Sequence, residues 1–218
     1  MQMSVSIAGA TGLVGGHCVY AFVARPEFEP VELLVRRPTP VLASERRAVA
    51  RIVDFEQLPA NQEILRTTHV ISALGTTMRK AGSKEAFRRV DYDYPLSLAR
   101  LALSRGARHF LLVSSVGADP ESRFFYTRVK GELEDAILAL GFRSVTIVRP
   151  SLLFGEREEF RPAESVGRYL MAVAPARYRP VHGRQVAAAL LAAALADRPG
   201  ATILESEQVR NLSPDARS

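Results

Sequence analysis

The sequence feature that most constrains the fold is the glycine-rich segment GATGLVGG at residues 9–16. Its glycines have the spacing G-x-x-G-x-x-G, between a strand-like apolar run at residues 5–8 and a helical pattern at residues 13–24. Glycine permits a tight turn, a close approach of backbone N–H groups to a pyrophosphate, and close packing of helix on strand. The helix N-terminus would then face the anion. We therefore predict a dinucleotide-binding loop built around Gly9, Gly12 and Gly15.

Strand-like and helical runs alternate along the rest of the chain. Further strands are expected at residues 31–35, 51–53, 69–73, 110–113, 145–148 and 202–205. Further helices are expected at residues 95–104, 126–140 and 185–196. Near-continuous apolar strands that alternate with helices are typical of a parallel sheet covered on both faces. The predicted fold class is therefore α/β, a doubly wound, Rossmann-like parallel sheet with a small C-terminal substrate-side region.

Length and composition favour a single domain. The chain has 218 residues, of which 47% are hydrophobic and 24% charged, and this balance excludes disorder as the main state. We expect residues 1–218 to form one dinucleotide-binding domain. Residues 155–182 interrupt the alternation with prolines and charges, so they are predicted to be a loop-rich cap over the active site.

Charge and cysteine content narrow the partners and the location. The net charge is +6, but the basic residues are scattered and lack interleaved aromatic residues, so we expect a small-molecule substrate rather than nucleic acid. The single cysteine, Cys18, indicates a reducing compartment and a buried apolar role. No apolar run approaches the roughly 20 residues of a membrane span. No basic segment precedes the first strand, so no signal peptide is expected and the predicted location is cytoplasmic.

The end of the second predicted strand indicates which cofactor binds. A site for NAD would place Asp or Glu there, whereas this chain has Arg36 and Arg37, about 20 residues after the glycine loop. Two guanidinium groups suit a 2′-phosphate and offer no acceptor to an unphosphorylated ribose. We therefore predict NADP (NADPH). Asp54, after the third strand, either accepts from the adenine amino group or starts a turn.

A Ser pair, a Tyr and a Lys form the candidate catalytic group. Ser114 and Ser115 follow the strand expected at residues 110–113, and Tyr126 and Lys130 lie four residues apart on the next helix, so they share a face. A phenol with a pKa near 10 is a poor acid or base at pH 7, and a nearby ammonium favours the phenolate. A Ser hydroxyl can hold the substrate oxygen, while the phenol exchanges a proton as hydride moves to or from a nicotinamide.

Two other chemistries are not expected. The four histidines, at positions 17, 69, 109 and 182, are far apart in the sequence and have no Cys or acidic residues at metal-ligand spacing, so no metal site is predicted. The G-x-S-x-G elbow of an acyl-transfer nucleophile is absent around Ser114 and Ser115.

The order of these motifs resembles the short-chain dehydrogenase/reductase family, in its atypical or extended form. The resemblance is greater to the Tat-interacting-protein-like NADPH-binding oxidoreductases and covers nearly the whole chain. It rests on the segments LGTT at residues 74–77, KAG at 80–82, VD at 90–91, SS at 114–115, GAD at 117–119, VKGE at 129–132, RP at 149–150 and RP at 161–162, together with Tyr126.

The resemblance implies a role for several residues. Tyr126 would be the proton donor and acceptor, and Lys130 would hold the nicotinamide ribose. Further cofactor contacts are implied at Thr11, Leu13, Val14, Arg36, Arg37, Leu74, Gly75, Pro150, Leu153 and Arg161. The chain departs from the family in two places. It has three residues before the first strand, where the animal proteins have an extension, and ALG at residues 73–75, where better-studied dehydrogenases have Asn-Ala-Gly.

Two function classes remain open from the sequence. The first is an NADPH-dependent oxidoreductase acting on a small carbonyl or alcohol, which Tyr126 and Lys130 favour. The second is an NADPH-binding regulatory or interaction protein with little turnover, which the altered segment at residues 73–75 favours. The alanine-rich helix at residues 185–196 is expected to pack on the sheet rather than to form an oligomer interface. The chain is therefore predicted to be a monomer or a weak dimer.

Overall fold

The computed structural model describes residues 2–38, 47–58, 64–154 and 178–212. Within them, the strands of the main sheet have the order β3-β2-β1-β4-β5-β6-β9, and every neighbouring pair is parallel. In chain order these strands are β1 (Met3–Ala8), β2 (Phe28–Val35), β3 (Ala48–Ile52), β4 (His69–Ser72), β5 (His109–Val113), β6 (Ser144–Arg149) and β9 (Gly200–Glu205). The predicted doubly wound parallel sheet is confirmed.

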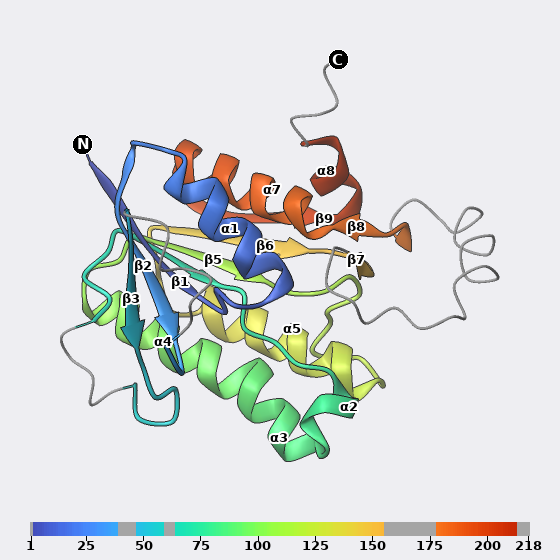
Figure 1. Cartoon of the computed structure of the whole chain (residues 1–218). Helices are drawn as coiled ribbons and strands as arrows, with labels where there is room; N and C mark the ends of the chain where they lie inside the picture. Colours follow the sequence, from blue (N-terminus) through green and yellow to red (C-terminus); the bar gives the residue numbers. More distant parts are fainter. Residues whose placement is uncertain (1, 39–46, 59–63, 155–177, 213–218) are drawn as a thin grey trace.

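Helices cover both faces of this sheet (Figure 1). One face carries α1 (Leu13–Val23), α7 (Gly183–Ala196) and α8 (Ser206–Asn211), and the other carries α4 (Tyr94–Ser104) and α5 (Phe125–Leu138). The chain between β4 and α4 folds into α2 (Met78–Ala81), α3 (Lys84–Arg88) and a π-helical turn, η3 (Arg89–Asp93). These three short elements were not predicted, because each is too short to show a helical period.

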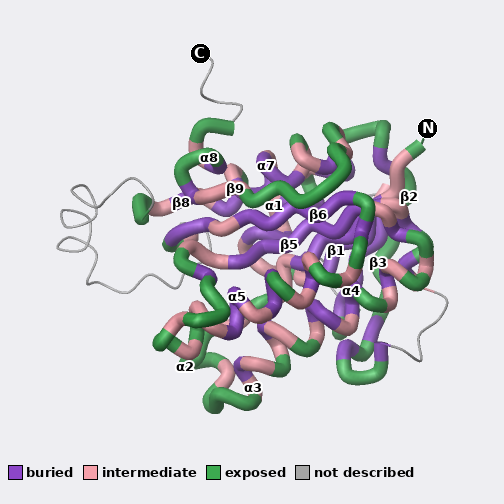
Figure 2. Tube along the Cα trace, turned by 180° about the vertical axis from the view of Figure 1, so that it is seen from behind, coloured by how far each residue is buried: buried purple, intermediate pink, exposed green. Residues whose placement is uncertain are grey.

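Each face of the sheet has its own hydrophobic core, and the central strands are buried on both sides (Figure 2). Along β5, Leu111 and Val113 pack under α1 and α7, whereas Phe110 and Leu112 pack under α4 and α5. This alternation follows from the two-residue period of a strand. It explains why the strands of the sequence are apolar without interruption and not apolar at every second residue.

The C-terminal part of the structure contains the helix and the strand that the sequence predicted there. Helix α7 packs on the sheet and on α1, with Val186 and Leu190 fully buried, as expected from its apolar pattern. The strand predicted at residues 202–205 is β9, which pairs with β6 residue by residue. Of the cap predicted at residues 155–182, residues 155–177 lie outside the described residues. The described remainder contributes β8 (Val181–His182), which pairs with β7 (Leu153–Phe154).

Candidate functional site

The glycine loop joins β1 to α1 at the carboxyl end of the sheet. Gly9 has φ +83°, and a Cβ atom there would lie 2.4 Å from the carbonyl oxygen of Ala73. A Cβ atom on Gly15 would lie 2.0 Å from the carbonyl oxygen of Gly9. Gly12, the N-cap of α1, donates from its N–H to that same oxygen at 2.8 Å. The glycines are therefore required by the turn and by the close contact of helix and strand, as predicted.

A cavity of about 530 Å³ runs from this loop along the carboxyl ends of β1, β2 and β4. It is called the cofactor groove below. Its walls include six residues that the sequence analysis named: Gly9, Thr11, Gly12, Arg36, Leu74 and Gly75. Leu13 and Val14 form the first turn of α1 directly beside it. The groove also contains Lys80, from the KAG segment of the resemblance, and two residues that sequence reasoning missed, Phe55 and Tyr94. The rings of Phe55 and Tyr94 stack with centroids 5.8 Å apart, and no spacing pattern foretells a pair 39 residues apart.

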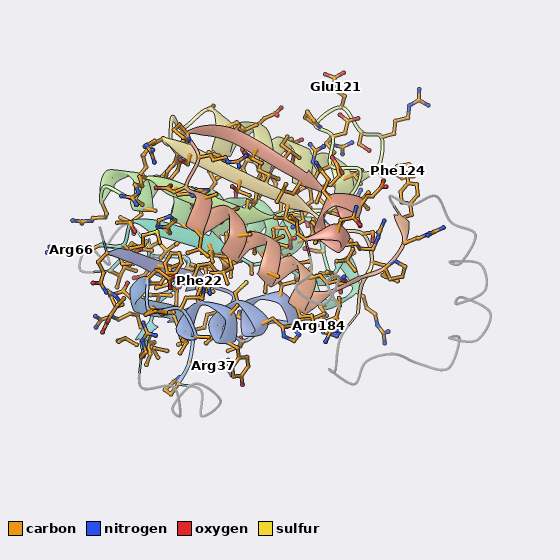
Figure 3. The ribbon with its side chains drawn as sticks, turned by 90° about the horizontal axis from the view of Figure 1, so that it is seen from above. Phe22, Arg37, Arg66, Glu121, Phe124 and Arg184 are labelled. Atoms are coloured by element: carbon orange, nitrogen blue, oxygen red, sulfur yellow. The ribbon has the colours of Figure 1, made fainter. Side chains whose placement is uncertain are left out.

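Arg36 and Arg37 follow β2, where a second cavity of about 460 Å³ is lined by Thr11, Val35, Arg36, Arg37 and Pro38. Both arginines are exposed, and Arg37 lies on the outside of the molecule (Figure 3). In the described part of the chain, no carboxylate makes an ion pair with either. Two exposed cations beside the end of the groove are suited to an anionic ligand.

Asp54 takes the second of the two roles that the sequence left open. Its carboxylate accepts a hydrogen bond from the N–H of Glu56 at 2.9 Å, and its carbonyl accepts from the N–H of Gln57. These bonds make a turn after β3. Asp54 does not line the cofactor groove, whereas its neighbour Phe55 does.

Lys130 lies close to the groove in a buried ion pair. Its Nζ atom is 2.7 Å from Oδ1 of Asp91, and the two residues are 4% and 1% exposed. The other oxygen of Asp91 accepts from the N–H of Thr76 at 2.8 Å. A Cβ atom on Gly75, which lines the groove, would be 3.9 Å from the ammonium.

Asp91 was not assigned a role from the sequence. It lies in η3, and π-helical turns of this kind are frequent at functional sites. One signal in the sequence could have pointed to it: Asp91 is an acidic residue that is buried within a short helical segment, where a carboxylate needs a partner. Because Asp91 and Lys130 are 39 residues apart, only the packing of η3 on α5 reveals that they pair.

Tyr126 lies one helical turn before Lys130 on α5. Its side chain is 37% exposed, and its ring packs on that of Phe87 with centroids 5.5 Å apart. Helix α5 is held close to the loop that follows β5, because a Cβ atom on Gly131 would lie 2.3 Å from the backbone of that loop at Asp119. This contact brings Tyr126 and the Ser pair to the same edge of the sheet.

The two serines after β5 have different surroundings. Ser114 is 6% exposed, and its hydroxyl donates to the carboxylate of Glu134. Ser115 is half-buried, and its hydroxyl has only a long bond of 3.4 Å to the carbonyl of Val116. Ser115 is therefore the better placed of the two to bind a substrate oxygen, and Ser114 is part of the internal structure.

Glu134 belongs to a charged network that the sequence analysis did not find. It is 2% exposed, and the Nε atom of Arg149 is 3.1 Å from each of its carboxylate oxygens. Arg149 also donates to Glu205 at 3.0 Å. Hydrogen bonding to Glu134 raises the pKa of the Arg149 guanidinium above its ordinary value. The network joins α5, β6 and the end of β9.

The other residues named from the sequence are Pro150, Leu153, Arg161 and Cys18. Pro150 is buried, and its carbonyl accepts from the N–H of Val116 at 2.9 Å, which ties the ends of β5 and β6 together. Leu153 begins β7. Arg161 lies outside the described residues. Cys18 is fully buried, as expected, and burial raises the pKa of its thiol to about 12.

One cluster of side chains could not be seen in the sequence. No metal site was predicted, because the histidines are far apart in the chain and lack Cys or acidic residues at metal-ligand spacing. The fold nevertheless brings His69, His109 and Asp197 together, so that one ligand atom from each lies within 4.8 Å of the others. Strand pairing, which sequence spacing does not show, places His69 directly opposite His109.

Comparison with known proteins identifies the family. Residues 9–198 match the family described as NAD(P)H-binding. The chain belongs to this NAD(P)H-binding family. Solved structures with the same fold include MoeE5 in complex with UDP-glucose and NAD, with a TM-score of 0.70 and 18% identity over 92% of this chain and 75% of that one. Another is WbmH from Bordetella bronchiseptica in complex with NAD⁺, with a TM-score of 0.72 and 15% identity over 94% and 76%.

Fungal relatives are more similar in sequence. The chain is 39% identical to the protein fmp52, mitochondrial, of Emericella nidulans, over 76% of this chain and 73% of that protein. It is 34% identical to FMP52, mitochondrial, of Saccharomyces cerevisiae, over 84% of each. The names of these relatives contradict the cytoplasmic location expected from the sequence. That expectation rested on the lack of a targeting pattern and is wrong. In the described residues, no helix is both long enough and apolar enough to span a membrane.

Proposed function

We propose that this protein is an NADPH-dependent oxidoreductase of the short-chain dehydrogenase type, which transfers a hydride to or from a small carbonyl or alcohol. One observation carries the proposal. The ammonium of Lys130 is fixed by Asp91 next to Gly75, which lines the cofactor groove, and it lies one helical turn from the partly exposed Tyr126. A cation and a phenol beside a nucleotide groove are the groups that proton exchange coupled to hydride transfer needs.

The groove suits NADPH on two grounds. Gly9, Thr11 and Gly12 line the groove at the N-terminus of α1, where backbone N–H groups would meet a pyrophosphate. At the other end, Arg36 and Arg37 would hold the 2′-phosphate, and Leu74 and Gly75 would line the middle. When bound, the nicotinamide supplies or accepts the hydride. The preference for NADPH over NADH rests on the two arginines.

Three side chains are proposed to handle the proton and the substrate oxygen. Tyr126 donates a proton to the substrate oxygen in reduction and accepts it in oxidation. Lys130 stabilises the phenolate electrostatically and binds the ribose across Gly75. Ser115 donates a hydrogen bond to the substrate oxygen, while Ser114 fixes Glu134. Pro150, Leu153 and Arg161 are proposed to close over the nicotinamide half, and residues 155–182 to cap the substrate.

A second function is favoured by the same ion pair. Asp91 neutralises Lys130 at 2.7 Å, so the ammonium has less electrostatic effect on Tyr126 than an unpaired one would have. An NADPH-binding regulatory or interaction protein with little turnover would tolerate this. Such a role agrees with the resemblance to the Tat-interacting-protein-like branch, to which we propose that the chain belongs.

The deciding experiment measures NADPH oxidation with a panel of aldehydes, ketones and quinones. We expect turnover with at least one class, and NADPH binding by calorimetry that is tighter than NADH binding. Binding of NADPH without turnover across the panel would favour the regulatory function instead. Equal affinity for the two cofactors would contradict the assignment of Arg36 and Arg37. A tight dimer in sedimentation at micromolar concentration would contradict the predicted monomer or weak dimer.

A further inference from the structure

A buried cluster of His69, His109 and Asp197 lies at the end of the sheet opposite the cofactor groove. His69 and His109 are the first residues of the adjacent strands β4 and β5, and Asp197 caps the C-terminus of α7. His69 is 0% exposed and His109 is 1% exposed. Nothing in the proposed oxidoreductase chemistry uses these residues, because the carboxyl ends of the strands, and not their amino ends, form the groove.

Two separations between the three ligand atoms are close to those of a metal site. Oδ1 of Asp197 is 3.7 Å from Nε2 of His69 and 3.3 Å from Nδ1 of His109, and all three atoms lie within 4.8 Å of one another. A tetrahedral ion with nitrogen and oxygen ligands at roughly 2.0–2.1 Å holds those ligands roughly 3.4 Å apart. The two distances to Asp197 are longer than ordinary N–H···O hydrogen bonds and near this value.

All three atoms are buried and have no hydrogen-bond partner. The other nitrogen of each imidazole does have one: Nδ1 of His69 is 2.8 Å from the hydroxyl of Thr68, and Nε2 of His109 is 2.9 Å from that of Thr146. Metal-binding histidines characteristically have such a second bond, which fixes the ring and its tautomer. Both rings are therefore already oriented with their remaining nitrogen toward Asp197.

The tautomer of His69 can be assigned from its partner. The hydroxyl of Thr68 donates to the carbonyl of Ser4 at 2.9 Å, so toward His69 it can only accept. Nδ1 of His69 then carries the hydrogen, and Nε2 presents a lone pair to the carboxylate of Asp197. A cation between these two buried acceptors would satisfy both of them.

The charges around Asp197 decide which cation fits. Its second oxygen, Oδ2, is 2.8 Å from Nε of Arg108 and 3.1 Å from Nη1 of Arg143. The arginines hold the carboxylate so that only Oδ1 faces the histidines. They also oppose a cation that depends on charge alone, such as Mg²⁺ or Ca²⁺. Two neutral imidazoles and one oxygen favour a borderline transition metal.

We propose that His69, His109 and Asp197 bind one divalent transition-metal ion, with Zn²⁺ the expected occupant. A cavity of about 150 Å³ adjoins His109, and it is also lined by Thr146 and residues of α7 and β9. A water molecule is the proposed fourth ligand. The ion would join the starts of β4 and β5 to the end of α7. Its role is structural, and it is separate from the oxidoreductase function.

The test uses the full chain, stripped with a chelator and dialysed against Zn²⁺ at about pH 7.5. We expect one zinc per chain by elemental analysis and a higher unfolding temperature with zinc than without. His109→Gln and Asp197→Asn should bind zinc at least about tenfold more weakly. Asn adopts the left-handed backbone conformation of position 197 well, so this variant preserves the helix cap. His17→Gln, which alters a histidine outside the cluster, should bind as the wild type does.

Two further measurements keep the proposal open to refutation. Arg143→Gln removes an opposing charge and should tighten zinc binding, whereas a purely structural Asp197–Arg143 pair would leave zinc binding unchanged. Co²⁺ bound to the wild type should give the intense visible absorption of a four-coordinate site. Absence of stoichiometric zinc in the wild type, unchanged affinity in the ligand variants, or a weak six-coordinate Co²⁺ spectrum would each overturn the proposal. None of these readouts depends on NADPH or on turnover.

Discussion

The two halves of the candidate active site are built in different ways. The nucleotide half, around Gly9, Gly15, Arg36 and Arg37, consists of bare backbone and exposed cations. The catalytic half depends on side chains held by buried charge pairs, such as Lys130 with Asp91. The first half is proposed to bind an anion with groups that need little support. The second half positions its reactive groups through partners from other parts of the chain, so it should be more sensitive to single substitutions.

The largest expected effect is on turnover. Tyr126→Phe removes the ionisable oxygen and keeps the ring on Phe87, so NADPH affinity and stability should hardly change. General acid–base catalysis contributes about 10²–10⁴ in rate, so kcat should fall by that factor. Steady-state kinetics with any substrate found in the panel measures it. Tyr20→Phe, on the exposed face of α1, is the matched control. An unchanged kcat would remove Tyr126 from the mechanism.

The next effect tests the support of the catalytic half. Asp91→Ala leaves the ammonium of Lys130 buried without its partner, and breaking a buried pair in this way costs about 3–5 kcal/mol. Denaturant unfolding measures the loss. Asp93→Ala removes an exposed carboxylate from the same turn and should change the free energy of unfolding far less. If both variants lose the same amount, the buried pair does not support the site.

Substitutions in the nucleotide half should change the affinity for NADPH and leave the stability of the fold unchanged. Arg36→Ala and Arg37→Ala each remove an exposed cation, and each charged hydrogen bond lost should weaken NADPH binding by about 1.5–3 kcal/mol. NADH binding should change little, because it lacks the 2′-phosphate. Calorimetry with both cofactors measures the difference. Arg25→Ala, an exposed arginine beyond the far end of α1, is the control. A matching loss in NADH affinity would argue against phosphate recognition.

The smallest effect separates the two serines. Ser114→Ala removes one hydrogen bond to Glu134, which keeps Arg149 as a partner, so stability should fall by about 1–1.5 kcal/mol. Ser115→Ala removes no comparable bond, so it should leave stability unchanged and lower kcat/KM. Thermal unfolding and kinetics on the same two variants show both results. The opposite pattern would exchange the roles assigned to Ser114 and Ser115.

The sequence by itself determined the parts that depend on local backbone requirements. Gly9 has a positive φ, and Gly15 lies against the backbone of Gly9 with no room for a Cβ atom. Both positions therefore require glycine, and the sequence shows this as glycines at a fixed spacing. Strands and helices could be recognised from local apolar patterns, and their alternation along the chain predicted the parallel sheet. Tyr126 and Lys130 could be paired because one helical turn fixes the distance between them.

Only the tertiary structure decided which distant residues meet. Lys130 pairs with Asp91, Glu134 with Arg149, and His69 with His109 because the order of strands and the packing of η3 on α5 bring them together. Sequence spacing carries no information about such contacts, since a charge pair or a metal ligand set requires proximity in space alone. The same holds for Ser114 and Ser115, which are adjacent in the chain and alike in chemistry but have different surroundings: Ser114 is buried against Glu134, and Ser115 is half-buried.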